Sequence, residues 1–161
     1  MAKIKVFDKG ILSDDNHAYP DDGVGFYSTH DVCKLFDIKM ETLQQWLKDG
    51  YVKPAYRVDY GRGQKSVFLR SQLVWIGVYK TMLDRGMARK TAAHWSDMFY
   101  GMMKSEGKYD FFDLVVLEFD GHGVNKLSAY SGGIRIDANP DGNDILIINV
   151  RRILRKISDF T

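Results

Sequence analysis

The 161-residue sequence predicts an α+β protein, in which a helical part that contains one hairpin precedes a unit of strands with a final helix. Apolar residues recur at helical spacing from residue 28 to about residue 104. Beyond about residue 107 the pattern changes to β-like runs separated by turns that contain glycine. The final run "VRRILRKISDF" carries a helical apolar stripe, made by Val150, Ile153, Leu154 and Ile157.

The chain divides into three predicted regions. Residues 1–26 form an extension, residues 27–104 the helical domain, and residues 105–161 a small α+β domain for dimerisation or for binding a partner or ligand. Hydrophobic residues make up 45% of the chain and charged residues 27%, which is typical of globular proteins. No apolar run is long enough for a transmembrane helix, and the start lacks the features of a signal peptide. We therefore expect a cytoplasmic protein without a membrane partner.

Two short helices joined by a brief turn are predicted at the start of the helical domain. In "STHDVCKLF", Ser28 is followed three residues later by Asp31, which is the spacing of a helix N-cap. The second helix, "METLQQWLKDG", ends at Gly50. Its apolar side carries Met40, Leu43 and Leu47 with Trp46 at the edge, and its polar side carries Glu41, Gln44, Gln45 and Lys48. The pair is a candidate helix-turn-helix.

A hairpin and two further helices complete this domain. The β-like runs "YRVDY" and "KSVFLR" flank "GRGQ", so the hairpin tip is predicted at 61–64. The next helix, "SQLVWIGVYKTMLDRG", is apolar nearly all round and is expected to be the buried spine, ended by Gly86. After it, "RKTAAHWSDMFYGMM" predicts a short helix weakened by Gly101, and "SEGKYD" predicts a linker.

Taken in this order, the motifs resemble the MerR-like winged helix-turn-helix family from Phe26 to about Trp95. "FYSTHDVCKLFDI" is similar to the family's opening helix, and "METLQQWLKDGYVKP" to its recognition helix and the exit from it. "YRVDYGRGQKSVFLRSQLVWI" resembles the wing and the next helix, and "LDRGM" the joint that follows. The resemblance implies a DNA-binding domain with helix 40–49 in the major groove and wing 56–68 on the flanking backbone.

The recognition helix departs from the family at one pair of residues. The family usually has Arg-Tyr where this sequence has Gln44 and Gln45. Glutamine can pair bidentately with N6 and N7 of adenine, so either side chain is a candidate for direct base reading. The alternative is that both are solvated residues of a helix surface.

Basic residues are concentrated in the middle of the chain. Residues 28–100 hold twelve basic and seven acidic residues, whereas both flanking parts are slightly acidic. We expect the basic side chains of the recognition helix and wing to contact phosphates, and Arg62, between two glycines, to approach the DNA closely. Ser28 either binds a phosphate at the N-terminus of its helix or only caps that helix. Tyr56 either donates a hydrogen bond to a phosphate or packs in the core. The predicted DNA-binding set is Ser28, Glu41, Thr42, Gln44, Gln45, Lys48, Lys53, Tyr56, Arg57, Arg62 and Lys65.

A second departure concerns the dimer. MerR regulators normally continue into a long helix that forms an antiparallel coiled coil, but "SDMFYGMMKSEGK" is too short for this and carries Gly101 and Gly107. We therefore expect a homodimer held by the C-terminal domain instead. The final helix also carries a basic cluster that either adds DNA contacts or forms a solvated face: Arg151, Arg152, Arg155 and Lys156.

No pattern typical of catalysis or metal binding stands out. The single Cys33 excludes a disulfide framework and is expected to be a packing residue, and the four histidines lack metal-ligand spacing. "DANPDGND" (137–144) begins like a calcium loop, but its twelfth position is Ile148 instead of Glu, so a turn is the simpler interpretation. We expect no enzyme, no cofactor and no metal.

The favoured function is sequence-specific binding of double-stranded DNA by a dimeric transcriptional regulator whose effector, if any, is unknown. One alternative is an architectural DNA binder of the phage excisionase or small terminase type, which should bind repeated sites. The other alternative is a protein-interaction adaptor that uses the C-terminal domain. The basic wing argues against the adaptor, because a local surplus of positive charge attracts phosphates.

Overall fold

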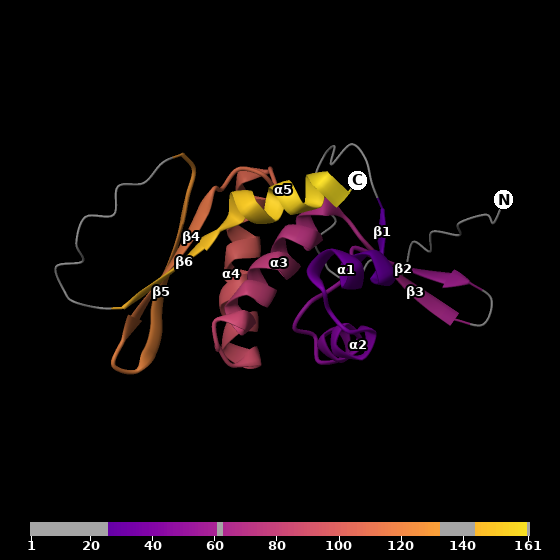
Figure 1. Cartoon of the computed structure of the whole chain (residues 1–161), viewed down its shortest axis with the longest axis horizontal. Helices are drawn as coiled ribbons and strands as arrows, with labels where there is room; N and C mark the ends of the chain where they lie inside the picture. The colour runs from indigo at the N-terminus through magenta and orange to yellow at the C-terminus, as the bar shows by residue number, and fades with distance from the viewer. Residues whose placement is uncertain (1–25, 61–62, 133–143, 161) are drawn as a thin grey trace.

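The computed structural model describes residues 26–60, 63–132 and 144–160, and Figure 1 shows their arrangement. The predicted extension up to residue 25, Arg62 of the wing and the turn at 137–143 lie outside these ranges. The elements in chain order are β1 (Tyr27–Ser28), α1 (Thr29–Phe36), α2 (Met40–Lys48), β2 (Tyr56–Tyr60), β3 (Gly63–Phe68), α3 (Arg70–Asp84), α4 (Arg89–Glu106), β4 (Leu114–Asp120), β5 (Gly123–Tyr130), β6 (Ile145–Asn149) and α5 (Val150–Phe160). The α+β class predicted from the sequence is confirmed.

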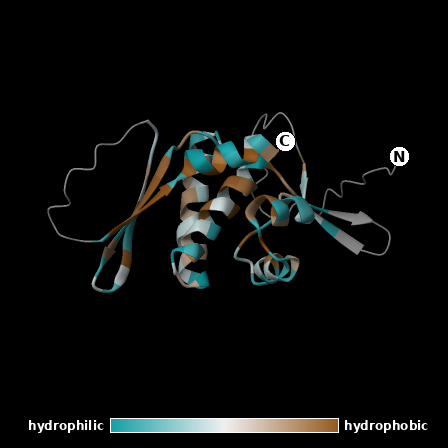
Figure 2. Ribbon diagram, in the orientation of Figure 1, coloured by the Kyte–Doolittle hydropathy of each residue, from teal (hydrophilic) through white to brown (hydrophobic). Residues whose placement is uncertain are grey.

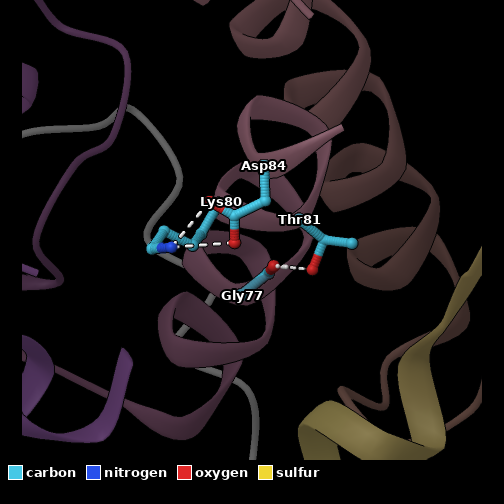
Figure 3. A network of polar contacts seen from close by, with 4 residues as sticks. All are labelled: Gly77, Lys80, Thr81 and Asp84. Atoms are coloured by element: carbon cyan, nitrogen blue, oxygen red, sulfur yellow. Dashed lines mark hydrogen bonds and ion pairs between the residues drawn. The ribbon is translucent and has the colours of Figure 1, made fainter. Parts of the chain in front are cut away.

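The buried spine is α3, as predicted. Every residue from Ser71 to Tyr79 is buried, because α1, α4 and α5 all pack against this helix. Figure 3 shows two contacts along its second half. The Thr81 hydroxyl donates to the carbonyl oxygen of Gly77 at 2.8 Å, and Lys80 forms an ion pair with Asp84 at 2.7 Å.

The N-terminal sheet is antiparallel, in the order β1-β3-β2. β2 and β3 form the predicted hairpin, and their register pairs Tyr60 with Gly63. The tip predicted at 61–64 was therefore too wide, since Gly63 and Gln64 belong to β3. The ladder of hydrogen bonds continues through these two residues despite the glycine, which by itself is a poor strand former.

The fourth helix begins where predicted, at Arg89, and ends three residues beyond the predicted end at Met103. α4 has 18 residues and continues through Gly101 to Glu106, so the first two residues of the predicted linker are helical. Phe99 and Met103 are fully buried on either side of Gly101. Their burial stabilises the helix by more than the roughly 1 kcal/mol that an interior glycine costs. The helix ends at Gly107, which has the left-handed φ of 69° that glycine adopts readily.

The C-terminal sheet is antiparallel in the order β5-β4-β6, and its inner face joins the hydrophobic core through Val115, Leu117 and Ile148. In Figure 2, hydrophobic colour runs along β4 and β6, whereas α5 shows both hydrophilic and hydrophobic residues. This fits the burial of Val150, Ile153 and Ile157, which are three of the four residues of the predicted apolar stripe.

A single hydrophobic cluster joins the helical part to the C-terminal elements, because α5 lies across α3 (Figure 1). Gly77 is a point of close approach between α3, α5 and α1. A Cβ atom placed there would lie 2.5 Å from Cγ2 of Ile153 and 3.0 Å from the ring of Phe36. α1, α3 and α5 therefore meet around a position that has no room for a side chain.

None of the helices in the described ranges combines the length and apolar character that crossing a membrane requires.

Candidate nucleic-acid interface

The second helix, α2, is held in place by two buried side chains. Leu43 is fully buried, and the Trp46 ring stands edge-on to the ring of Tyr79 in α3, with 4.9 Å between the ring centroids. The opposite side of α2 is exposed and polar, as predicted, and Thr42 is half-buried at its border. The exposed polar residues are Glu41, Gln44, Gln45 and Lys48. We call these four residues the α2 face.

The two glutamines of the α2 face differ in their hydrogen bonds. The side-chain amide of Gln45 donates to the carboxylate of Asp49 at 2.7 Å, one helical turn further on. The Gln44 side chain forms no hydrogen bond with any described residue. Both the donor and the acceptor of its amide are therefore available to a partner, whereas Gln45 must first release Asp49.

The wing carries its basic residues on two faces. Arg57 lies opposite Ser66 in the hairpin register, and Lys65 lies opposite Val58. Since side chains alternate between the two faces of a strand, Arg57 and Lys65 point to opposite sides of the hairpin. Lys65 is exposed and Arg57 is half-buried. The structure therefore does not bring these two predicted phosphate contacts together on one face.

Two other predicted site residues lie near the base of the wing. Lys53 is exposed in the segment between α2 and β2. Tyr56 is half-buried, and its ring packs edge-on against Phe26 at 6.4 Å between centroids. Tyr56 therefore packs against an exposed residue and is not part of the hydrophobic core, and its phosphate contact stays a prediction.

Ser28 caps α1 in the way that the sequence predicts. Its hydroxyl oxygen accepts a hydrogen bond from the backbone N–H of Asp31 at 3.2 Å, and its own N–H donates to the Asp31 carboxylate at 2.7 Å. The two residues form a capping box. A carboxylate at this helix terminus opposes the approach of a phosphate, so the geometry favours helix capping, and a phosphate contact by Ser28 stays a prediction.

Sequence reasoning missed a group of basic residues at the turn between α3 and α4. Arg85, Arg89 and Lys90 are all exposed there, and α4 begins without a side-chain cap. Burial raises the pKa of Tyr79 to about 12, and the charges of Arg89 and Asp49 also act on this phenol. In Figure 1, the turn between α3 and α4 and the helix α2 lie on the same side of the molecule, away from α5. The available signal was the basic sequence on both sides of Gly86.

Candidate metal ligands do not gather in the part of the chain that the structure describes. No group of three or more histidine, cysteine, aspartate or glutamate side chains in these ranges could hold a metal ion. Cys33 is half-buried and packs against the core, as predicted. Burial raises the pKa of its thiol, and the charge of Glu41 adds to the effect.

Two helices joined by a tight turn, with a polar outer face on the second and an antiparallel hairpin directly after it, define a winged helix-turn-helix domain. Residues 27–98 match the family model described as "MerR HTH family regulatory protein", so this part of the chain is a MerR HTH domain. The match confirms the resemblance and its extent, and it identifies the domain as a DNA-binding module of transcriptional regulators. No curated protein matches the chain.

Proposed function

We propose that this protein is a sequence-specific regulator that binds double-stranded DNA, with α2 in the major groove and the wing against the flanking backbone. The observation that carries the proposal is the α2 face: four exposed polar side chains on a helix fixed by Leu43 and Trp46, within the MerR HTH domain. A rigid helix with polar side chains on its outer surface is suited to reading the edges of bases.

Within this interface we assign base reading first to Gln44, because its amide is free to pair with adenine. Glu41, Thr42 and Gln45 complete the surface that faces the groove. The phosphate contacts that we propose come from Lys48, Lys53, Tyr56, Arg57, Arg62 and Lys65. Because Arg57 and Lys65 point to opposite sides of the hairpin, we expect the one that faces the DNA to contribute most.

The exposed turn between α3 and α4 is a second place for backbone contacts in this proposal. Arg85, Arg89 and Lys90 are exposed at this turn, and in Figure 1 the turn lies on the same side of the molecule as α2 and away from α5. Positive charges beside a groove-reading helix add affinity without sequence preference, and their effect weakens as the salt concentration rises.

We also propose that the protein acts as a homodimer in the cytoplasm. One side of α4 is buried by α3 and the C-terminal elements, through Ala92, Ser96, Phe99 and Met103. This side is unavailable for the coiled coil that MerR regulators normally form, so we assign the dimer contacts to the C-terminal domain. Two linked copies would read two half-sites with greater affinity than one.

The test is selection of bound sequences from a random double-stranded DNA pool at about 150 mM salt, close to physiological ionic strength. We expect a palindromic or repeated motif, because a symmetric dimer reads the same half-site twice. Absence of enrichment, together with binding that vanishes as salt rises, would show that the protein is not a sequence-specific regulator.

Matched lysine variants sharpen this test. Lys65→Gln should weaken binding to all sequences alike and lower the salt dependence by about one counterion. Lys108→Gln removes the same charge from an exposed position outside the MerR HTH domain and should leave binding unchanged. Equal effects of the two variants would mean that net charge, and not the wing, sets the affinity.

A further inference from the structure

A cleft of about 330 Å³ opens between the first residue of α3, the segment before β4, and α5. The cleft lies where the C-terminal elements meet the MerR HTH domain, and no residue of α2 lines it. Apolar residues of α5, Leu154 and Ile157, form part of its wall. Polar side chains from all three segments form much of the remainder, and two features of their charges indicate a ligand site.

The first feature is Arg70, which is half-buried and has no carboxylate partner among the described residues. Its Nε donates to the phenol oxygen of Tyr27 at 3.3 Å, and its Nη1 donates to that of Tyr109 at 3.3 Å. A guanidinium has five N–H donors, so several remain for another acceptor. Charges that are taken out of water are usually paired with an opposite charge, whereas the two acceptors that the half-buried guanidinium of Arg70 contacts are neutral phenols.

The second feature is a set of charges of both signs in the same cleft. Arg151 and Asp113 neutralise one another through a direct ion pair. Arg155, Asp110 and Asp159 also line the cleft, yet none of them forms an ion pair with another described residue. The cleft thus combines two arginines, Arg70 and Arg155, with two aspartates, Asp110 and Asp159, and none of the four forms an ion pair with a described residue.

We propose that this cleft binds a small zwitterion, such as a free amino acid, with its acidic group against Arg70 and Arg155 and its amine against Asp110 or Asp159. A simple anion would satisfy the arginines but would be repelled by the aspartates. A molecule that carries both charges satisfies both sets, while its apolar part contacts Leu154 and Ile157. Charge-assisted hydrogen bonds of this kind are among the strong ones in proteins.

The position of Arg70 makes this site an effector site. Arg70 comes two residues after the last residue of β3 in the wing, and its bond to Tyr27 reaches β1, which pairs with that strand. A ligand that draws the guanidinium into the cleft changes the contact with Tyr27 at the base of the wing. This regulatory step rests on the proposed DNA-binding function, whereas ligand binding itself does not.

The first arm of the test is titration calorimetry of the full chain, without DNA, against each of the standard free amino acids. Acetate, inorganic phosphate and methylamine serve as singly functional probes. We expect saturable binding of at least one amino acid and much weaker binding of the three simple probes. If no amino acid binds, or if acetate or phosphate binds as tightly, the proposal is wrong.

Two variants on α5 locate the site. Arg155→Gln removes a charge from the cleft and should weaken amino-acid binding roughly tenfold or more, the effect of losing a charge-assisted hydrogen bond. Arg152→Gln removes the same charge from the same helix at an exposed residue that does not line this cleft, and should bind normally. Both positions are exposed, so both variants should fold. Equal affinities in the two variants would overturn the assignment of the cleft.

The second arm measures DNA affinity with and without the amino acid that binds. We expect a change of several-fold, at the same ligand concentration in Arg152→Gln and only at a roughly tenfold higher ligand concentration in Arg155→Gln. Ligand binding that leaves DNA affinity unchanged would overturn the effector role. A protein that binds the amino acid but no DNA would instead count against the proposed function and leave the ligand site standing.

Discussion

α2 and α3 use their side chains in opposite ways. In α3, nine consecutive residues from Ser71 to Tyr79 are buried, whereas α2 buries only Leu43 and Trp46 and exposes four polar residues. The difference follows from their neighbours, because α3 is covered by α1, α4 and α5. Substitutions in α3 should therefore change stability, and substitutions on the α2 face should change binding alone.

The largest effect is expected from Leu73→Ala in α3. Leu73 is fully buried, so the variant loses apolar burial and leaves a cavity that the packed helices around it fill only in part. We expect the free energy of unfolding to fall by about 3 kcal/mol. Chemical denaturation measures the change, with Gln44→Ala as the exposed control, for which a loss under about 0.5 kcal/mol is expected. Similar losses in both variants would remove the distinction between the two helices.

Two glycines inside helices extend the comparison to α4. Gly77 in α3 has Cγ2 of Ile153 at 2.5 Å from the position of an added Cβ, whereas nothing lies within 4 Å of that position at Gly101 in α4. Gly77→Ala should destabilise the protein by about 2 kcal/mol through overpacking. Gly101→Ala should stabilise it by up to about 1 kcal/mol, because alanine is the better helix former. Thermal unfolding of both variants gives the signs, and a stable Gly77→Ala would disprove the close packing of α3 and α5.

Substitutions of the two glutamines test whether the α2 face reads bases. Gln44→Ala should lower the preference for the selected DNA site by about 1 to 3 kcal/mol, the worth of one bidentate base contact, with little change in non-specific affinity. Gln45→Ala should cost less, because the Gln45 amide already donates to Asp49. Competition binding against unrelated DNA measures both. A larger effect of Gln45→Ala would reverse the assignment of base reading.

Local patterns were sufficient to predict most of these elements. The cap at Ser28, the two faces of α2, the apolar run of α3 and the stripe of α5 all depend on residues close together in the sequence. The predicted fourth helix already passed through Gly101 to Met103, and only its last three residues, up to Glu106, were missed. The burial of Phe99 and Met103, which offsets the cost of Gly101, depends on partners distant in the sequence.

The arrangement of the candidate sites depends on contacts that no local pattern contains. Arg70 bonds to Tyr27 and Tyr109, which are 43 and 39 residues away in the sequence. The hydrogen bond that Gln45 donates to Asp49 requires the helix geometry. The placement of Arg57 and Lys65 on opposite faces requires the strand register. The sequence identifies these residues as polar or basic. Whether their side chains are free to contact DNA or a ligand depends on how the elements pack.

The smallest effect on stability is expected at Asp113. This residue helps to hold α5 against β4, and α5 in turn covers α3. Its carboxylate accepts hydrogen bonds from Arg151 and from the backbone N–H of Gly132. The Arg151 contact, and then the Gly132 amide, lower the pKa of Asp113 below its ordinary value. A lowered pKa in the folded state means that the charged carboxylate stabilises the fold above the ordinary aspartate pKa. This contribution is lost as the pH falls through the lowered value.

Asp113→Asn should therefore be less stable than the parent protein at neutral pH, and the difference should shrink as the pH falls toward the acidic range. The loss should be modest, because ion pairs at the surface contribute little. Urea denaturation at several pH values measures the difference, and Arg151→Gln should produce a similar pH dependence. Since the two residues share one contact, the double variant should lose less than the sum of the single variants. A difference that stays constant with pH would mean that α5 is held by its buried residues alone.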